Sequence, residues 1–200
     1  MSITEIDRFV EHDVLLRDGR KVNIRPIVSD DASKLQALFK RLSTRSIYFR
    51  FLGYRKELTD DEAQYFTDVD YQNQMALVAT IENDRDESLI GVARYANLSI
   101  SNPAEAEFAI VVEDQYQGFG LGTKLLHELI NYARAHGICT FSAVIHNNNN
   151  RIWHILRSTG LSFERMSSEC GVSEIRIRLM PESVIKAGES HDQNFISAAG

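Results

Sequence analysis

The spacing of hydrophobic positions changes several times along the chain, from the two-residue repeat of strands to the three- and four-residue repeat of helices. The segment "VLLRDGRKVNIRPI" predicts two short strands around an Asp18-Gly19 turn. Further strands are expected at 75–82, 88–100, 105–112 and 139–145, with a strand pair over 163–180. Helices are expected at 29–43, 59–69, 121–137 and 148–160. Ser29 or Asp30 is expected to cap the first helix, and Gly137 to stop the third.

This order of elements predicts a mixed α/β sheet rather than a doubly wound one. The early strands can pair through hairpins, whereas the 121–137 helix should form a right-handed crossover between parallel strands. No repeat or linker interrupts residues 14–180, so we expect one domain there, after an N-terminal extension (1–13). The tail, 181–200, is polar and rich in small residues, and we expect it to be flexible.

The composition restricts the partners. The net charge is −6, the isoelectric point is near 5.5, and no basic block offsets the acidic excess, which argues against a nucleic-acid partner. No apolar run is long enough to span a bilayer, and "MSITEIDRFVEHD" lacks a signal-peptide core. Cys139 and Cys170 have no metal-ligand spacing. We therefore expect a cytoplasmic protein with reduced cysteines, no metal and no membrane partner.

Three glycines alternate with larger residues at positions 118, 120 and 122, between the strand "FAIVV" and the helix "LLHELINYA". The free N–H groups at a helix N-terminus favour an anion, and glycine lets a diphosphate approach the backbone. The spacing fits neither a P-loop nor the dinucleotide fingerprint. A merely tight turn is the alternative, although one glycine would serve for that.

Two motifs carry a resemblance to the GNAT superfamily of acetyl-CoA-dependent N-acetyltransferases. "YQGFGLG" resembles its Gln/Arg-x-x-Gly-x-Gly/Ala signature, read as Gln117, Gly120 and Gly122. "NNRIWHILRSTGLSF" resembles the second cofactor motif, from Asn149 to Gly160, with two extra residues before Phe163. The resemblance implies the GNAT fold, a mixed sheet of about six or seven strands flanked by about four helices.

Other stretches resemble the catalytic domain of Pat-type protein lysine acetyltransferases, namely "DGRKVNIRPIVSDDASKL", "RLSTRSIYFRFLG", "DYQNQMALVAT", "GVARY" and "AEFAIVVEDQYQGFGLGTKLL". This resemblance implies acetyl transfer from acetyl-CoA to an amine, most simply a protein lysine. A small-molecule amine acetyltransferase and a non-catalytic acyl-CoA sensor are the alternatives. The exposed C-terminal strand edge could also support a homodimer.

The resemblance assigns the cofactor contacts to two segments and one side chain. The coenzyme A diphosphate would lie on backbone N–H groups of Gln117, Gly118, Phe119, Gly120, Leu121, Gly122 and Thr123. The pantetheine arm would pair with Ile110, Val111 and Val112, with a main-chain N–H near Val112 facing the thioester carbonyl. Asn149 would hydrogen-bond the pantetheine.

An amine must be neutral to attack a thioester, and a lysine with a pKa near 10.4 is deprotonated in only about one molecule in 2,500 at pH 7. A nearby base therefore matters. Glu107 precedes the glycine turn and shares a strand face with Ala109 and Val111, although a solvent-facing role is the alternative. The Pat-type resemblance implies that Glu107 is the general base, with Glu105 a weaker candidate. Leu156 stands where many GNAT enzymes have a tyrosine acid, which implies direct transfer without a dedicated acid.

The segment "RSIYFRF" places Arg45 and Arg50 among aromatic residues. We expect it to line the acceptor side, or to reach the adenosine 3′-phosphate through an arginine. An RNA-binding platform is disfavoured by the acidic net charge.

Overall fold

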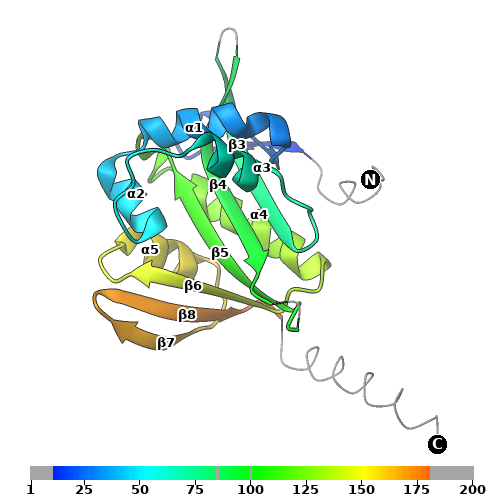
Figure 1. Cartoon of the computed structure of the whole chain (residues 1–200), viewed down its shortest axis with the longest axis vertical. Coiled ribbons are helices and arrows are strands. Elements are labelled where there is room, and N and C mark those ends of the chain that lie inside the picture. The colour runs from blue at the N-terminus through cyan, green and yellow to red at the C-terminus, as the bar shows by residue number, and fades with distance from the viewer. Residues whose placement is uncertain (1–10, 84–85, 100, 181–200) are drawn as a thin grey trace, which may run out of the picture.

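A single mixed sheet runs through the computed structural model, which describes residues 11–83, 86–99 and 101–180 (Figure 1). Its eight strands follow the order β1-β2-β3-β4-β5-β6-β8-β7. Every neighbouring pair is antiparallel except β5 and β6, which are parallel. The strands are β1 (His12–Leu15), β2 (Lys21–Pro26), β3 (Gln74–Asn83), β4 (Asp86–Asn97), β5 (Glu105–Val112), β6 (Thr140–His146), β7 (Phe163–Glu169) and β8 (Val172–Arg178).

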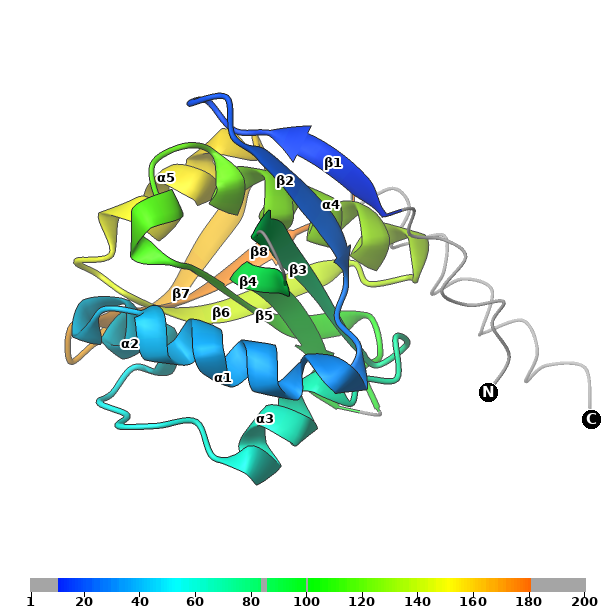
Figure 2. The same cartoon turned by 90° about the horizontal axis from the view of Figure 1, so that it is seen from above.

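Helices cover both faces of this sheet. Within the described ranges they are α1 (Ala32–Arg41), α2 (Thr44–Phe51), α3 (Asp60–Thr67), α4 (Leu121–Ala135) and α5 (Asn150–Ser158). Figure 2 shows α1, α2 and α3 on one side of the sheet and α4 and α5 on the other. The sheet is therefore the middle of three layers, as expected for an α/β domain.

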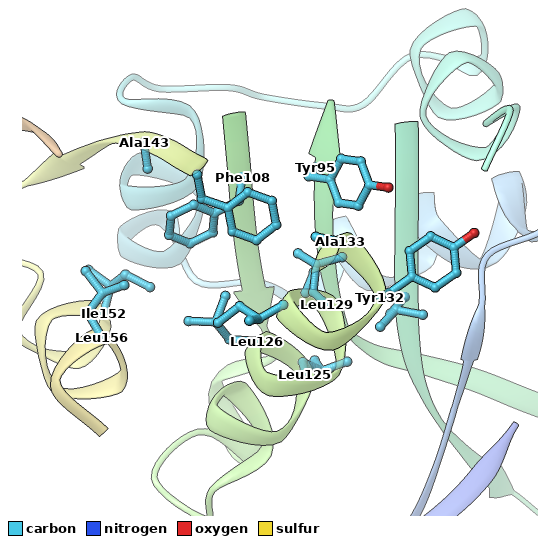
Figure 3. Packing of buried hydrophobic residues seen from close by; sticks show 14 of the residues in the cluster. Tyr95, Phe108, Leu125, Leu126, Leu129, Tyr132, Ala133, Ala143, Ile152 and Leu156 are labelled. Atoms are coloured by element: carbon cyan, nitrogen blue, oxygen red, sulfur yellow. The ribbon is translucent and has the colours of Figure 1, made fainter. Parts of the chain in front are cut away.

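Each face of the sheet has its own apolar core. The larger core lies against α4 and α5, where Leu125, Leu126 and Leu129 of α4 pack beneath Phe108 of β5 (Figure 3). The rings of Phe108 and Phe141 stack with their centroids 5.5 Å apart, joining β5 to β6. The smaller core fills the space between the sheet and α1 to α3. Along β5, even-numbered residues face the larger core, and this alternation turns Glu107 toward the opposite side.

The predicted mixed sheet and the parallel crossover through α4 are confirmed. The sheet has eight strands where about six or seven were expected, and α2 adds a fifth helix to the expected four or so. The sequence of α2, "TRSIYFRF", contains aromatic and β-branched residues of weak helix propensity, so its pattern alone does not predict a helix. Its local signal is Ser43, whose side chain accepts a hydrogen bond from the Ser46 N–H.

The predicted cap of α1 is wrong. A short 3₁₀ turn, Ser29–Asp31, precedes α1, and Asp31 is the N-cap residue in place of Ser29 or Asp30. Most of the expected extension (1–13) and the whole expected tail (181–200) lie outside the described residues. In the part of the chain that is described, no helix has the length and apolar character needed to cross a membrane.

Four charged side chains connect β2 and β4 to α1. The Arg25 guanidinium donates to both carboxylate oxygens of Asp31, at 2.7 and 2.8 Å, and also binds Glu87. The Lys34 ammonium lies 2.8 Å from Glu87. Hydrogen bonds from Arg25 and Lys34 outweigh partial burial and lower the pKa of the Glu87 carboxyl from 4.5 to about 2.

We expect this network to make the free energy of unfolding depend on pH in the acid range. Because the pKa of Glu87 is depressed in the folded state, its contribution is complete above about pH 4.5 and is lost as pH falls toward 2. Glu87→Gln should lower stability by about 1 kcal/mol at pH 7 and converge with the wild type near pH 2. Urea unfolding at several pH values measures this.

Glu164 provides the matched control, because it forms an exposed pair with Arg178. Glu164→Gln should lower the stability at pH 7 by less than Glu87→Gln does, because exposed ion pairs contribute little. A constant difference in stability between Glu87→Gln and the wild type across pH 2 to 7 would contradict the prediction.

Candidate active site

A cavity of about 540 Å³ opens where β5 and β6 separate. The two strands pair only between residues 105–107 and 140–142 and then diverge (Figure 1). The volume lies within the roughly 300–1,000 Å³ typical of ligand pockets. The predicted site residues in its lining are Glu107, Ile110, Val111, Val112, Gln117, Gly118, Gly120, Gly122, Thr123 and Asn149. The side chains of Phe119 and Leu121 pack against the larger core instead.

The three glycines between β5 and α4 have different structural roles. Gly118 and Gly120 have φ angles of 86° and 93°, a left-handed conformation that favours glycine. At Gly122 the constraint is packing, because a Cβ there would lie 2.8 Å from Cδ1 of Ile155 on α5. The first N–H groups of a helix have no intrahelical partner, and no side chain in the described part of the chain caps those of α4. This helix end therefore favours a negative charge in the cavity.

The β1–β2 hairpin contacts residues 117–123, the segment with the three glycines, which we call the glycine connection. The Arg17 N–H donates to Phe119 O at 3.0 Å, and Arg20 stacks over the rings of Tyr116 and Phe119 at 4.4 and 4.8 Å. The Arg17 side chain enters the cavity lining, with Nε 3.7 Å from where a Cβ of Gly120 would lie. The sequence did not indicate Arg17 as a site residue, because nothing in the hairpin pattern shows that this arginine contacts Phe119 and Gly120, which lie far away in the chain.

The backbone of β5 presents polar groups to the gap between the strands. The Glu113 N–H donates to Ile90 O on β4 at 2.8 Å. Because hydrogen-bonded and non-hydrogen-bonded pairs alternate along an antiparallel ladder, the backbone N–H and C=O groups of Ile110 and Val112 point away from β4. The Val112 carbonyl accepts a hydrogen bond from Gln117 Nε2 at 2.7 Å. The Gln117 Oε1 atom is buried and has no hydrogen-bond partner among the described residues. Gln117 therefore fixes the start of the glycine connection and leaves one acceptor unused.

The two glutamates of β5 lie in different surroundings. Glu107 is exposed to the cavity, and no hydrogen bond or ion pair engages its carboxylate within the described ranges. Glu105 accepts hydrogen bonds from Arg176 at 2.9 Å and from Asn102 at 3.1 Å, and it lies outside the cavity lining. Of the two carboxylates, that of Glu107 therefore lies in the cavity lining without a hydrogen-bond partner among the described residues.

Helix α5 forms the wall opposite β5. Asn149 is its N-cap, and its Oδ1 accepts a hydrogen bond from the Ile152 N–H at 3.4 Å. Leu156 is 1% exposed and belongs to the larger core, so it offers no acid to the cavity. Cys139 and Cys170 are free thiols outside the lining.

The sequence matches the model of the acetyltransferase (GNAT) domain over residues 21–162. Over 136 residues it is 38% identical to the acetyltransferase PA5475 of Pseudomonas aeruginosa, covering 68% of this chain and 70% of that protein. It is 27% identical over 164 residues to the acetyltransferase Pat of Mycolicibacterium smegmatis, covering 82% of this chain and 48% of that protein. The chain therefore spans about half of that second relative.

Solved structures give the same result. The GNAT domain of Streptomyces lividans PAT superimposes with a TM-score of 0.77 at 29% identity, covering 89% of this chain and 99% of that domain. An acetyltransferase from Salmonella typhimurium, solved with its cofactor acetyl-CoA, has a TM-score of 0.62 at 19% identity, covering 80% of this chain and 95% of that one. This second likeness is one of fold. Because the family model matches residues 21–162 and the Pseudomonas acetyltransferase is 38% identical, the chain belongs to the GNAT acetyltransferase family.

Proposed function

We propose that this protein transfers an acetyl group from acetyl-CoA to an amine, most simply a protein lysine side chain, with Glu107 as general base. The observation that carries the proposal is that one cavity contains both the unpaired Glu107 carboxylate and the glycine connection. The resemblance of the sequence to Pat-type protein lysine acetyltransferases supports a lysine acceptor, and the similarity to acetyltransferase Pat and to the PAT GNAT domain agrees with that resemblance.

The residues of the cavity fit acetyl-CoA. The uncapped start of α4 and the Arg17 guanidinium offer positive charge to a diphosphate, and Gly120 lets it approach the backbone. The polar groups of Ile110 and Val112 that face the gap can pair with the amides of the pantetheine arm as a neighbouring strand would. Acetyl-CoA bound to the Salmonella neighbour of the same fold supports this choice of donor.

The chemistry then divides between the β5 backbone and the Glu107 carboxylate. Acetyl-CoA supplies an acetyl group activated as a thioester. A main-chain N–H near Val112 would stabilise negative charge on the acetyl oxygen. Glu107 would accept the proton of the attacking amine, directly or through one water. Coenzyme A is a thiol with a pKa of about 8.5, so it can leave as a thiolate without a side-chain acid. The apolar Leu156 on α5, at the position where many GNAT enzymes have a tyrosine acid, agrees with this.

Removal of the proposed base should slow transfer without affecting the donor. Glu107→Gln keeps the size of the side chain but cannot accept a proton at neutral pH, so kcat/KM for the amine should fall by about 10²–10⁴ at pH 7. The acetyl-CoA dissociation constant should change by less than about twofold. Steady-state acetylation of lysine peptides and proteins, together with calorimetric titration of acetyl-CoA, measures both.

Glu105→Gln is the control, because Glu105 lies on the same strand but is already engaged by Arg176. It should retain most of the activity. Full activity of Glu107→Gln at pH 7 would remove Glu107 from the mechanism, and binding of acetyl-CoA without transfer to any amine by the wild type would favour a sensor.

The glycine connection should be intolerant of a negative side chain. Gly120→Glu places a carboxylate where we expect the diphosphate, and should weaken acetyl-CoA binding by more than about 100-fold. Gly137→Glu is the control, because Gly137 has a similar φ of 80° and nothing within 4 Å of a built Cβ. Unchanged affinity in Gly120→Glu, measured by calorimetry, would refute the diphosphate assignment.

Arg17 should contribute charge to the same site. Arg17→Met should weaken acetyl-CoA binding about tenfold, since a hydrogen bond to a charged group is worth about 1.5–3 kcal/mol. The loss should shrink at high salt. Lys21→Met on the same hairpin is the control, because Lys21 pairs with Asp13 outside the cavity. Equal affinities for the two variants would exclude a contact between Arg17 and the donor.

A further inference from the structure

Helix α2 places Arg50 in the wall between two cavities. The helix is fixed at its start by Asp114, whose carboxylate accepts from the Ser43 N–H and Oγ, each at 2.8 Å, and from Ser46 Oγ at 2.9 Å. At the other end, Arg50 lines both the 540 Å³ cavity and a second cavity of about 40 Å³ behind it. The two cavities also share Phe51, Ala109 and Val111.

The charges around Arg50 are unbalanced. Arg55 pairs with Glu62, and Arg94 donates to Phe66 O and to the Gln74 side chain, each at 3.4 Å. Arg50 stacks on the Phe51 ring at 4.9 Å, but no hydrogen bond or ion pair engages its guanidinium in the described residues. The groups that act on it electrostatically are Arg94 of β4, Arg55 beyond α2 and Glu107 of β5. Of the three cations in this region, Arg55 is already paired with Glu62, and the remaining carboxylate, Glu107, makes no ion-pair contact with Arg50.

Arg50 keeps its charge despite this environment. Burial lowers the pKa of Arg50 to about 10, helped by repulsion from Arg94 and Arg55 and opposed by Glu107. At pH 7 the protonated form still exceeds the neutral form by about 1,000-fold. The Arg50 side chain is half-buried, and a charge that is partly removed from water without a counter-ion is unfavourable, so such charges are ordinarily paired. An anion that enters the cavity would relieve this cost.

The donor's phosphates do not suit this position. Arg50 lies near Glu107 and Arg94, and Arg94 pairs with Ala109 in the middle of β5. The glycine connection begins beyond Val112, about 10 Å further along the strand. That end has its own cation, Arg17. The anion for Arg50 must therefore enter on the side of the proposed base.

We propose that Arg50 binds a carboxylate of the acceptor, next to the amine whose proton Glu107 removes. This subsite rests on the proposed function, because it assumes an amine at Glu107. It selects acceptors in which an amine and a carboxylate are neighbours. Such a carboxylate belongs either to an acidic residue beside the target lysine of a protein or to a small amino acid.

Two matched pairs of acceptors test the subsite and separate these sources. The first pair is a seven-residue blocked peptide with one lysine flanked by glutamates, and the same peptide with glutamines. The second pair is 6-aminohexanoate and its amide. The wild type should prefer a carboxylate member by about tenfold in kcat/KM, as expected for one charge-assisted hydrogen bond. The pair that shows the preference identifies the source.

Arg50→Met removes the charge and should abolish the preference by raising KM for the carboxylate member about tenfold. Activity on the neutral member and the affinity for acetyl-CoA should change by less than about twofold, which also reports that the variant is folded. Arg50→Lys should restore part of the preference, because it keeps a positive charge without the planar fork. Arg45→Met is the matched control on the same helix, since Arg45 is exposed and outside both linings.

Equal kcat/KM of the wild type for both members of each pair would overturn the subsite. A uniform loss of activity in Arg50→Met with a displaced pH profile would also overturn it, because Arg50 would then act through Glu107. If the protein binds acetyl-CoA but acetylates no amine, the proposed function fails instead. In that case, fluorescence anisotropy of the two labelled peptides, with coenzyme A present, tests whether the subsite exists. The subsite predicts that the wild type binds the glutamate peptide more tightly than Arg50→Met does, and equal affinities would overturn it.

Discussion

The separation of β5 from β6 is the constraint on which the site depends. Only three residue pairs join these strands, so the rest of β5 has an edge inside the sheet whose polar groups lack a neighbouring strand. Apolar contacts on one face of the sheet keep the two strands apart at this end. The Phe108 ring of β5 stacks on Phe141 of β6, and Ile155 of α5 packs against Gly122 in the first turn of α4. Packing on one face thus maintains a cleft that a continuous sheet would close.

The charge of the cavity is opposite in sign to that of the whole chain. The net charge of −6 is that of the whole chain, whereas the described residues that line the cavity include Arg17, Arg50 and Arg151 and a single carboxylate, Glu107. The overall charge argues against a nucleic-acid partner, but it says nothing of a small anion that enters the fold. A cleft lined by positive charge with low-dielectric walls can concentrate anions even in an acidic protein.

Local sequence signals predicted the features that depend on neighbouring residues. The left-handed glycine at Gly137 follows from turn chemistry, and the face of Glu107 on β5 follows from the two-residue spacing of a strand. Sequence did not reveal Arg17 in the lining, or that the half-buried Arg50 guanidinium would have no counter-ion among the described residues. Both depend on contacts between segments far apart in the chain, which a linear pattern does not encode.

The hairpin that holds the glycine connection has a consequence for folding. The hydrogen bond from Arg17 to Phe119 joins residues roughly 100 positions apart, so the connection is complete only after the start of the chain has docked on its middle. Docking of the hairpin and binding of an anion at the glycine connection are then thermodynamically linked, so each stabilises the other. The first strands of the chain, which contribute no reacting group, would in this way gain order from whatever anion occupies the cleft.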